Sequence, residues 1–223
     1  MNTSNSIRAV ILDLDGTLVD SACEIVAALN RTLEELGLAG LGTKVVEALI
    51  GRGVRSLVER ALQLTEGGAL IDVASAVERF EGHYAQTIAT EATLYPGVLE
   101  GLRRMDAAGL QLAVVTNKPR LFTEKLLAHL AIDRFFVAVV TGDDGIARKP
   151  SGDMLVAAAA KMGARIEQTL MLGDSENDVL AARDAGCPVW CVPYGYNEGR
   201  PAESLQCDRM VATLLEAARL LGP

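Results

Sequence analysis

The sequence contains few of the residues that several classes of protein depend on. Aromatic residues make up 4% of its 223 residues, with only two histidines and four cysteines. The histidines, His83 and His129, are far in sequence from Cys187 and Cys191, so we expect no zinc site with closely spaced ligands. Without a secretory signal, the expected state of the cysteines is the free thiol.

Basic charge is also in deficit. The chain has 21 Lys and Arg against 29 Asp and Glu, a net charge of −8, which argues against nucleic acid or an anionic membrane as the main partner. No apolar run approaches the roughly 20 residues that span a bilayer. The polar start, Met1–Ser6, lacks the pattern of a secretory signal, so we predict a cytoplasmic protein. A small phosphorylated metabolite remains possible as partner, because it needs only a few donors and a cation. The oligomeric state, monomer or small homo-oligomer, stays open.

Half of the residues are apolar, and they recur in short runs followed by turn residues and helical patterns. The runs lie at residues 9–12, 112–115, 136–140, 170–172 and 189–192. Strands that alternate with helices predict an α/β fold, a Rossmann-like parallel sheet with helices on both faces.

One stretch breaks this alternation. Residues 21–88 have apolar stripes at helical spacing and no convincing strand. We therefore predict an α/β core domain from residues 1–18 and 92–223 and an inserted all-α cap domain over residues 19–91. The alternative is that these helices pack on the sheet within one domain.

Two local patterns in this stretch carry further expectations. Ser21 and Glu24 have the spacing of a capping box at the start of the first helix. Phe80 and Tyr84 fall on one helical stripe and are expected to form part of the core of the insert.

The most informative feature is the segment Asp13-Leu14-Asp15-Gly16-Thr17 after the first apolar run. A strand places residues two apart on the same side, so Asp13 and Asp15 lie together and repel unless a cation or a shared proton lies between them. Gly16 allows a tight turn whose N–H groups, with the Thr17 hydroxyl, can face an anion. This pattern suggests metal-assisted phosphoryl transfer, with Asp13 as nucleophile and Asp15 as general acid and base.

Other polar residues follow later strands and are expected at the same edge of the sheet. Thr116 and Asn117 can contact the transferring oxygens, and Lys149 can neutralise developing charge. Asp174 and Asp178, four residues apart, can supply or orient oxygen ligands for Mg²⁺ together with Asp13. Lys118 is expected at the surface beside the site.

The chain resembles the haloacid-dehalogenase-like superfamily in four motifs that occur in the family's order. Residues 13–21 resemble the DxDGTxxDS motif, residues 116–118 the second motif, residues 149–150 the third and residues 173–178 the fourth.

This resemblance implies a nucleophilic Asp13 and phosphate binding by Thr116 and Lys149. It also implies Mg²⁺ held by Asp13, the Asp15 backbone carbonyl and Asp174, with Asp178 as an auxiliary ligand. The presence of Asp15 favours phosphate esters over C–Cl or C–P bonds.

The finer resemblance, in residues 50–62 and 192–201, is to bacterial phosphoglycolate phosphatases. It implies a Mg²⁺-dependent phosphatase that converts 2-phosphoglycolate to glycolate and phosphate. Arg52 or Arg55 can offer the substrate carboxylate a cation, although many such relatives carry Asn at the position of Arg52. The alternatives are a phosphatase of another sugar phosphate, a phosphosugar mutase of the same superfamily, and a catalytically silent binding module.

Overall fold

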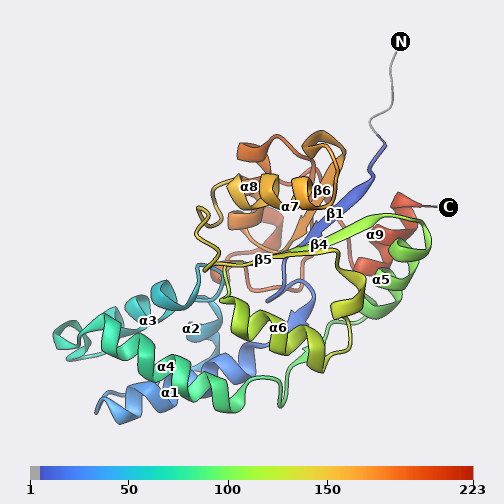
Figure 1. Cartoon of the computed structure of the whole chain (residues 1–223). Helices are drawn as coiled ribbons and strands as arrows, with labels where there is room; N and C mark the ends of the chain where they lie inside the picture. Colours follow the sequence, from blue (N-terminus) through green and yellow to red (C-terminus); the bar gives the residue numbers. More distant parts are fainter. Residues whose placement is uncertain (1–5, 223) are drawn as a thin grey trace.

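The computed structural model describes residues 6–222. Its main sheet has six parallel strands in the order β5-β4-β1-β6-β7-β8, and Figure 1 shows helices wrapped around it. The strands are β1 (Ala9–Leu12), β4 (Gln111–Val115), β5 (Ala138–Val140), β6 (Thr169–Gly173), β7 (Val189–Cys191) and β8 (Arg209–Met210). The predicted fold class is confirmed.

Helices cover both faces of this sheet, because alternate residues of each strand point to opposite sides. Val10 and Leu12 face a core shared with α5 (Val98–Ala107), α6 (Arg120–His129) and α9 (Leu214–Leu221). Ala9 and Ile11 face a second core shared with α7 (Asp153–Lys161) and α8 (Glu176–Ala185). β1, at the centre of the sheet, is apolar throughout because both of its faces are buried.

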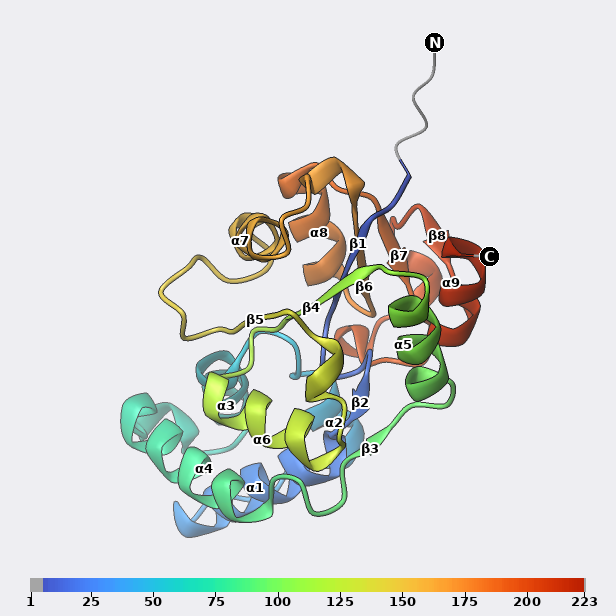
Figure 2. The same cartoon turned by 45° about the vertical axis from the view of Figure 1, so that its right-hand side comes forward.

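A second, two-stranded sheet joins the main sheet to four helices. Its strands, β2 (Val19–Asp20) and β3 (Thr93–Leu94), are antiparallel and lie between the main sheet and the helices in Figure 2. We call residues 21–92, between these strands, the helical insert. It contains α1 (Ala22–Glu35), α2 (Thr43–Glu47), α3 (Val54–Gln63) and α4 (Val73–Thr87).

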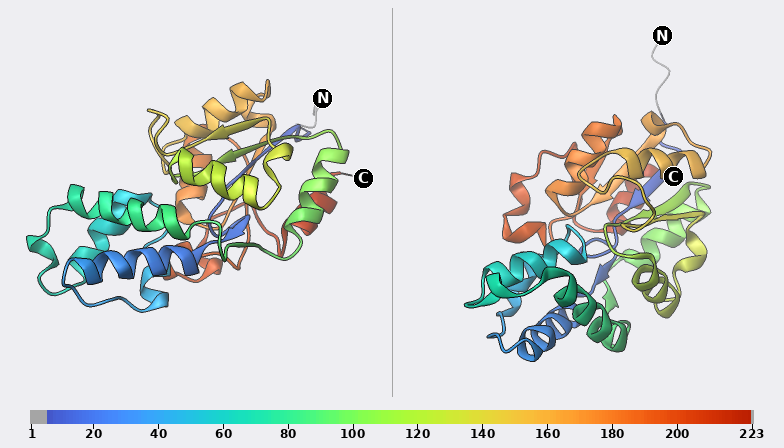
Figure 3. Two further views of the ribbon diagram at one scale, coloured as in Figure 1. Left: turned by 60° about the horizontal axis from the view of Figure 1, so that its bottom comes forward. Right: turned by 60° about the vertical axis from the view of Figure 1, so that its left-hand side comes forward.

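The helices of the insert gather at one end of the molecule in both views of Figure 3. Their buried side chains, such as Leu29 and Phe80, are nevertheless continuous with the core on the Leu12 face of the sheet. The helical content predicted for this stretch is confirmed, whereas the division into domains at residues 18/19 and 91/92 stays a prediction. Those boundaries fall beside β2 and β3, which the sequence did not predict.

The prediction for the first strand agrees with the structure residue by residue, because β1 spans residues 9–12. α8 begins with a capping box, in which the Ser175 side chain accepts the backbone N–H of Asp178 and the Asp178 side chain accepts that of Ser175. The predicted capping box of Ser21 and Glu24 is wrong. The Ser21 hydroxyl donates to Asp15 over 2.5 Å, and the Glu24 carboxylate binds backbone N–H groups at residues 89–92.

Across residues 6–222, no helix combines the length and the apolar character that crossing a bilayer requires. The cysteines are free thiols, as expected. The signal-free start that supports a cytoplasmic location lies mostly outside the described residues, and that location stays a prediction.

Candidate active site

Asp13 follows β1 directly at the carboxyl edge of the sheet, where its N–H donates to the Leu172 carbonyl over 3.0 Å. The residue is 8% exposed. Burial raises the pKa of Asp13 well above its usual range, and the nearby Lys149 only partly offsets this. A carboxylate in these surroundings holds a proton more readily unless further positive charge lies beside it.

Lys149 is the buried cation at this point. Its Nζ lies 2.8 Å from Asp13 Oδ1 and 2.7 Å from Asp178 Oδ1, and it donates to the Val115 carbonyl over 3.0 Å. Burial disfavours the ammonium, but the two carboxylates outweigh it and raise the pKa of Lys149. The lysine therefore stays charged and fixes the orientation of Asp13.

Asp174 and Asp178 follow β6 and are almost completely buried. The Asp178 carboxylate accepts from the backbone N–H groups of Asp174 (3.2 Å) and Ser175 (3.1 Å) at the start of α8. Asp174 accepts from the Thr17 hydroxyl and from the Tyr196 N–H, each over 2.8 Å. Burial, together with the charge of Asp178, raises the pKa of Asp174 to about 7.

The residues at this edge fit a divalent cation. One carboxylate oxygen from each of Asp13, Asp174 and Asp178 lies within 4.8 Å of the others. When all three carboxylates are ionised, one lysine leaves two negative charges in a buried place, and a single divalent ion balances them. Oxygen ligands of this kind suit Mg²⁺.

Glycines make room for these carboxylates. A Cβ on Gly16 would come within 2.5 Å of Asp174 Oδ2, and one on Gly195 within 2.2 Å of Asp174 Cβ. Gly16 also has a φ of +89°, which favours glycine. Its N–H donates to the Val19 carbonyl over 2.9 Å and the Thr17 hydroxyl donates to Asp174, so in this structure neither donor is free for an anion as the sequence suggested.

Asp15 has partners of its own, and one of them corrects the sequence analysis. The Nζ of Lys118 lies 2.9 and 3.0 Å from the two Asp15 oxygens, and the Ser21 hydroxyl donates to Oδ1 over 2.5 Å. Lys118 was expected at the surface, but only 6% of it is exposed. Burial disfavours its charge, yet Asp15 outweighs this effect and raises the pKa of Lys118. The position of Lys118 within the second motif was the available signal, but the sequence does not reveal which way a side chain turns.

Thr116 and Asn117, which follow β4, are buried beside the two aspartates. The Thr116 hydroxyl accepts the N–H of Lys118 over 3.2 Å, which leaves its own proton as a donor. The Asn117 side-chain amide donates to the carbonyls of Gly51 (3.0 Å) and Lys149 (2.9 Å), so it connects the helical insert to the edge of the sheet.

A small cavity of about 50 Å³ lies between this edge and the helical insert. The sheet side contributes Asp13, Asp15, Thr116, Asn117 and Lys118, and the insert contributes Ile25, Ile50, Gly51, Gly53, Val54, Leu57, Phe80 and Tyr84. Phe80 and Tyr84, expected in the core of the insert, are buried there and also line this cavity. Its dimensions suit a substrate of few atoms beyond the reacting group.

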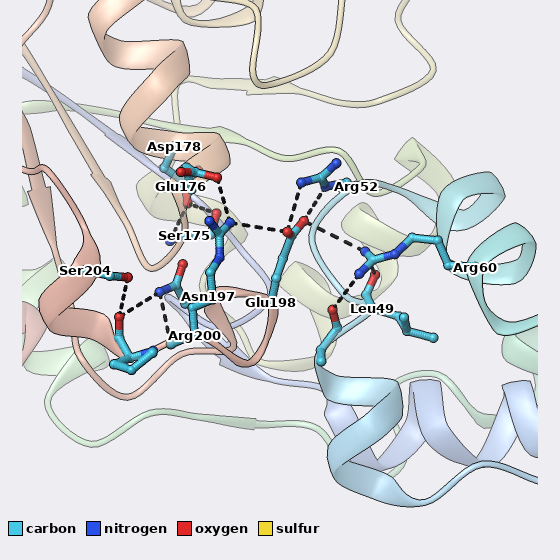
Figure 4. Close-up of polar contacts among 12 residues, drawn as sticks. Leu49, Arg52, Arg60, Ser175, Glu176, Asp178, Asn197, Glu198, Arg200 and Ser204 are labelled. Atoms are coloured by element: carbon cyan, nitrogen blue, oxygen red, sulfur yellow. Dashed lines mark hydrogen bonds and ion pairs between the residues drawn. The ribbon is translucent and has the colours of Figure 1, made fainter. Parts of the chain in front are cut away.

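The two arginines predicted to bind substrate are outside the set that lines this cavity. Arg52 donates from Nε and Nη2 to the Glu198 carboxylate, with a distance of 2.9 Å from Nη2 to Oε2. Figure 4 shows Glu198 between Arg52 and Arg60 of the insert and Arg200 of its own loop. Arg55 is exposed on α3. Substrate binding by Arg52 or Arg55 stays a prediction.

The fold and the site together define a class of enzyme. A parallel α/β sheet that gathers aspartates and lysines at its carboxyl edge, beside a helical insert, suits hydrolytic chemistry on an anionic group. The family model of haloacid dehalogenase-like hydrolases matches residues 10–192, and the chain belongs to this family. The predicted resemblance and the predicted enzyme class are confirmed.

Relatives along the whole chain agree with this. The phosphoglycolate phosphatase of Nitrosospira multiformis is 41% identical, over 96% of each chain. The plasmid-encoded phosphoglycolate phosphatase of Cupriavidus necator is also 41% identical, over 96% of this chain and 93% of that one. A crystal structure from Haemophilus somnus, described as a predicted phosphoglycolate phosphatase, superimposes with a TM-score of 0.91 at 29% identity and covers 98% of this chain and 99% of that chain.

Proposed function

We propose that this hydrolase is a Mg²⁺-dependent phosphatase that converts 2-phosphoglycolate to glycolate and inorganic phosphate. The observation that carries the proposal is the pair Asp13 and Asp15, which share one small cavity but have separate lysine partners. Two carboxylates in unlike surroundings are suited to unlike roles. The names of the relatives support the substrate.

In the first step, an Asp13 oxygen attacks phosphorus while the bond from phosphorus to the ester oxygen breaks. Asp15 gives its proton to that departing oxygen, so glycolate leaves and the phosphoryl group remains on Asp13. In the second step, Asp15 takes a proton from water, whose oxygen attacks phosphorus and releases phosphate and the free Asp13 carboxylate. Lys149 keeps Asp13 in position, and the Thr116 hydroxyl donates to a phosphoryl oxygen.

The residues proposed to hold Mg²⁺ are Asp13, the Asp15 backbone carbonyl and Asp174. Asp178, which is occupied by Lys149 and by two backbone N–H groups, orients this set as an auxiliary group. When bound, the ion supplies positive charge against the phosphoryl oxygens as they approach Asp13.

The size of the cavity favours a two-carbon leaving group over the larger sugar phosphates. The test is steady-state release of inorganic phosphate across a panel that includes 2-phosphoglycolate and hexose phosphates. Equal or faster turnover of the hexose phosphates contradicts the substrate, and turnover without release of phosphate indicates a mutase.

Asp13→Asn tests the nucleophile. We expect it to lower kcat by on the order of 10⁴-fold or more while the protein stays folded, because the amide is a poor nucleophile. Asp106→Asn, on the exposed side of α5, is the matched control and should leave kcat unchanged. Retained activity in Asp13→Asn removes this residue from the role. The oligomeric state stays a prediction.

A further inference from the structure

Tyr84 in α4 is a polar residue of the cavity lining that the proposed mechanism does not use. Tyr84 is 1% exposed, and its buried hydroxyl has no hydrogen-bond acceptor among the described residues, while the Lys118 ammonium lies beside it. A buried hydroxyl proton without an acceptor is energetically unfavourable, and a ligand in the cavity that accepts it would remove this cost.

The ring of Tyr84 is firmly held. It stacks on Phe80, with the ring centroids 5.5 Å apart, and meets Phe122 edge to face with the centroids 4.9 Å apart. Phe122 belongs to α6 of the sheet side, so the tyrosine is fixed from both sides of the cavity. Preorganised groups of this kind bind a ligand with little loss of conformational freedom.

Lys118 stands over the same ring, with its Nζ 4.8 Å from the Tyr84 centroid. Two N–H donors of this ammonium go to the two Asp15 oxygens, and the ammonium also interacts with the Tyr84 hydroxyl. The hydroxyl proton of Tyr84 is then left without an acceptor within residues 6–222. The positive charge of Lys118 and this O–H donor together suit one anionic group.

Among the residues that the structure describes, Tyr84 is the one polar side chain that the helical insert contributes to the lining of the cavity. Ile25, Ile50 and Leu57 are apolar, and the arginines at positions 52 and 55 are outside the set that lines the cavity. In such apolar surroundings, a charge-assisted hydrogen bond is stronger than it is in water. An anion that enters here has to meet Lys118 and Tyr84.

We propose that Lys118 and the Tyr84 hydroxyl bind the carboxylate of the leaving group and so select phosphate esters that carry an anion next to the ester carbon. Asp15 contacts the ester oxygen in the proposed mechanism and also contacts Lys118, so a group one carbon beyond that oxygen lies within reach of the lysine. This inference rests on the proposed function and assigns to Lys118 the cationic role that the sequence suggested for Arg52 or Arg55.

Tyr84→Phe is the sharpest test, because it removes one oxygen and keeps the ring. With 2-phosphoglycolate we expect kcat/KM to fall about tenfold, mainly through KM, since a hydrogen bond to a charged group is lost. With ethyl phosphate, which has no carboxylate, kcat/KM should stay within about twofold. Tyr95→Phe, on a half-buried tyrosine outside this cavity, is the matched control and should change neither.

Lys118→Met complements this variant. It should abolish the preference for 2-phosphoglycolate over ethyl phosphate and also slow both reactions, because Lys118 pairs with Asp15. Equal losses with both substrates in Tyr84→Phe, no loss with either, or a wild-type protein that does not prefer 2-phosphoglycolate would each overturn the inference.

A binding measurement separates this inference from the proposed function. Titration calorimetry of 2-phosphoglycolate into Asp13→Asn, with and without Tyr84→Phe, should show about tenfold weaker binding when the hydroxyl is absent. If the wild type hydrolyses no phosphate ester, the proposed function fails, and this titration still decides whether Tyr84 binds the carboxylate. Unchanged affinity overturns the inference even if the phosphatase activity is present.

Discussion

Replacing Glu24 with glutamine perturbs the connection between the helical insert and the segment that leads back to the sheet. Glu24 is 2% exposed, in the first turn of α1. Its Oε1 accepts the N–H groups of Thr90 (2.7 Å), Glu91 (2.8 Å) and Ala92 (2.9 Å), and its Oε2 accepts that of Ala89 (3.1 Å). Ala89 has a φ of +66°, so these successive N–H groups form a concave site for an anion.

The expected loss follows from these four bonds. A hydrogen bond to a charged acceptor contributes roughly 1.5–3 kcal/mol, against about 0.5–1.5 kcal/mol for a neutral one. Glutamine keeps one oxygen, so three bonds weaken by about 1 kcal/mol each, while its amide nitrogen faces the N–H of Ala89 and leaves that donor unpaired. Since neighbouring bonds are not additive, we expect a total loss of about 3 kcal/mol.

Urea denaturation followed by circular dichroism measures this loss, and a thermal scan should show a melting temperature lower by about 6–12 °C for a chain of this size. Glu34→Gln is the matched control, because Glu34 is exposed on the same helix and should change stability by less than about 0.5 kcal/mol. If Glu24→Gln is as stable as this control, the charge of the Glu24 carboxylate does not stabilise the connection between the helical insert and residues 89–92.

Two further predictions concern the buried charges at the edge of the sheet. Because the pKa of Asp174 is raised to about 7, its ionised form is disfavoured on folding, so its contribution to the stability of the metal-free protein is full below about pH 4 and lost as the pH rises through 7. The same proton competes with Mg²⁺, whose affinity, measured by calorimetry, should fall between pH 8 and pH 6. Lys149→Met leaves two buried carboxylates without their cation and should lower the free energy of unfolding by about 3–5 kcal/mol.

Each of these two predictions has a control variant. Asp174→Asn should flatten the pH dependence of the free energy of unfolding between pH 4 and pH 7. An unchanged profile would show that another group causes this pH dependence. Lys161→Met, on an exposed lysine at the end of α7, should leave stability unaltered. Equal stability of the two lysine variants would mean that the carboxylates near Lys149 do not need its charge.

Features with a local cause could be predicted from the sequence. β1 was found at residues 9–12 because a short apolar run ends at two charged residues. The start of α8 at a capping box and its end at the left-handed Gly186 likewise depend on residues of the helix and its immediate neighbours. The order of the motifs along the chain, together with the rule that parallel strands align their carboxyl ends, brought the aspartates and Lys149 to one edge.

Features with distant partners could not be predicted in this way. Glu24 has the spacing of a capping box, but its carboxylate accepts from N–H groups 65 to 68 residues away in the sequence. β2 and β3 are only two residues long and exist because they pair with each other, so neither has a periodicity of its own. Lys118 was expected in solvent because the sequence gives no sign that Asp15 and Tyr84 enclose it.

The sequence by itself determined the fold class, the helical insert and the family, together with the identity of the residues at the carboxyl edge. Those properties depend on local periodicity and on short motifs. Only the tertiary structure decided which lysine pairs with each aspartate: Asp13 is paired with Lys149 and Asp15 with Lys118. It also placed Tyr84 rather than an arginine at the cavity. Burial and charge pairing depend on which distant side chains meet, and only the folded chain brings them together.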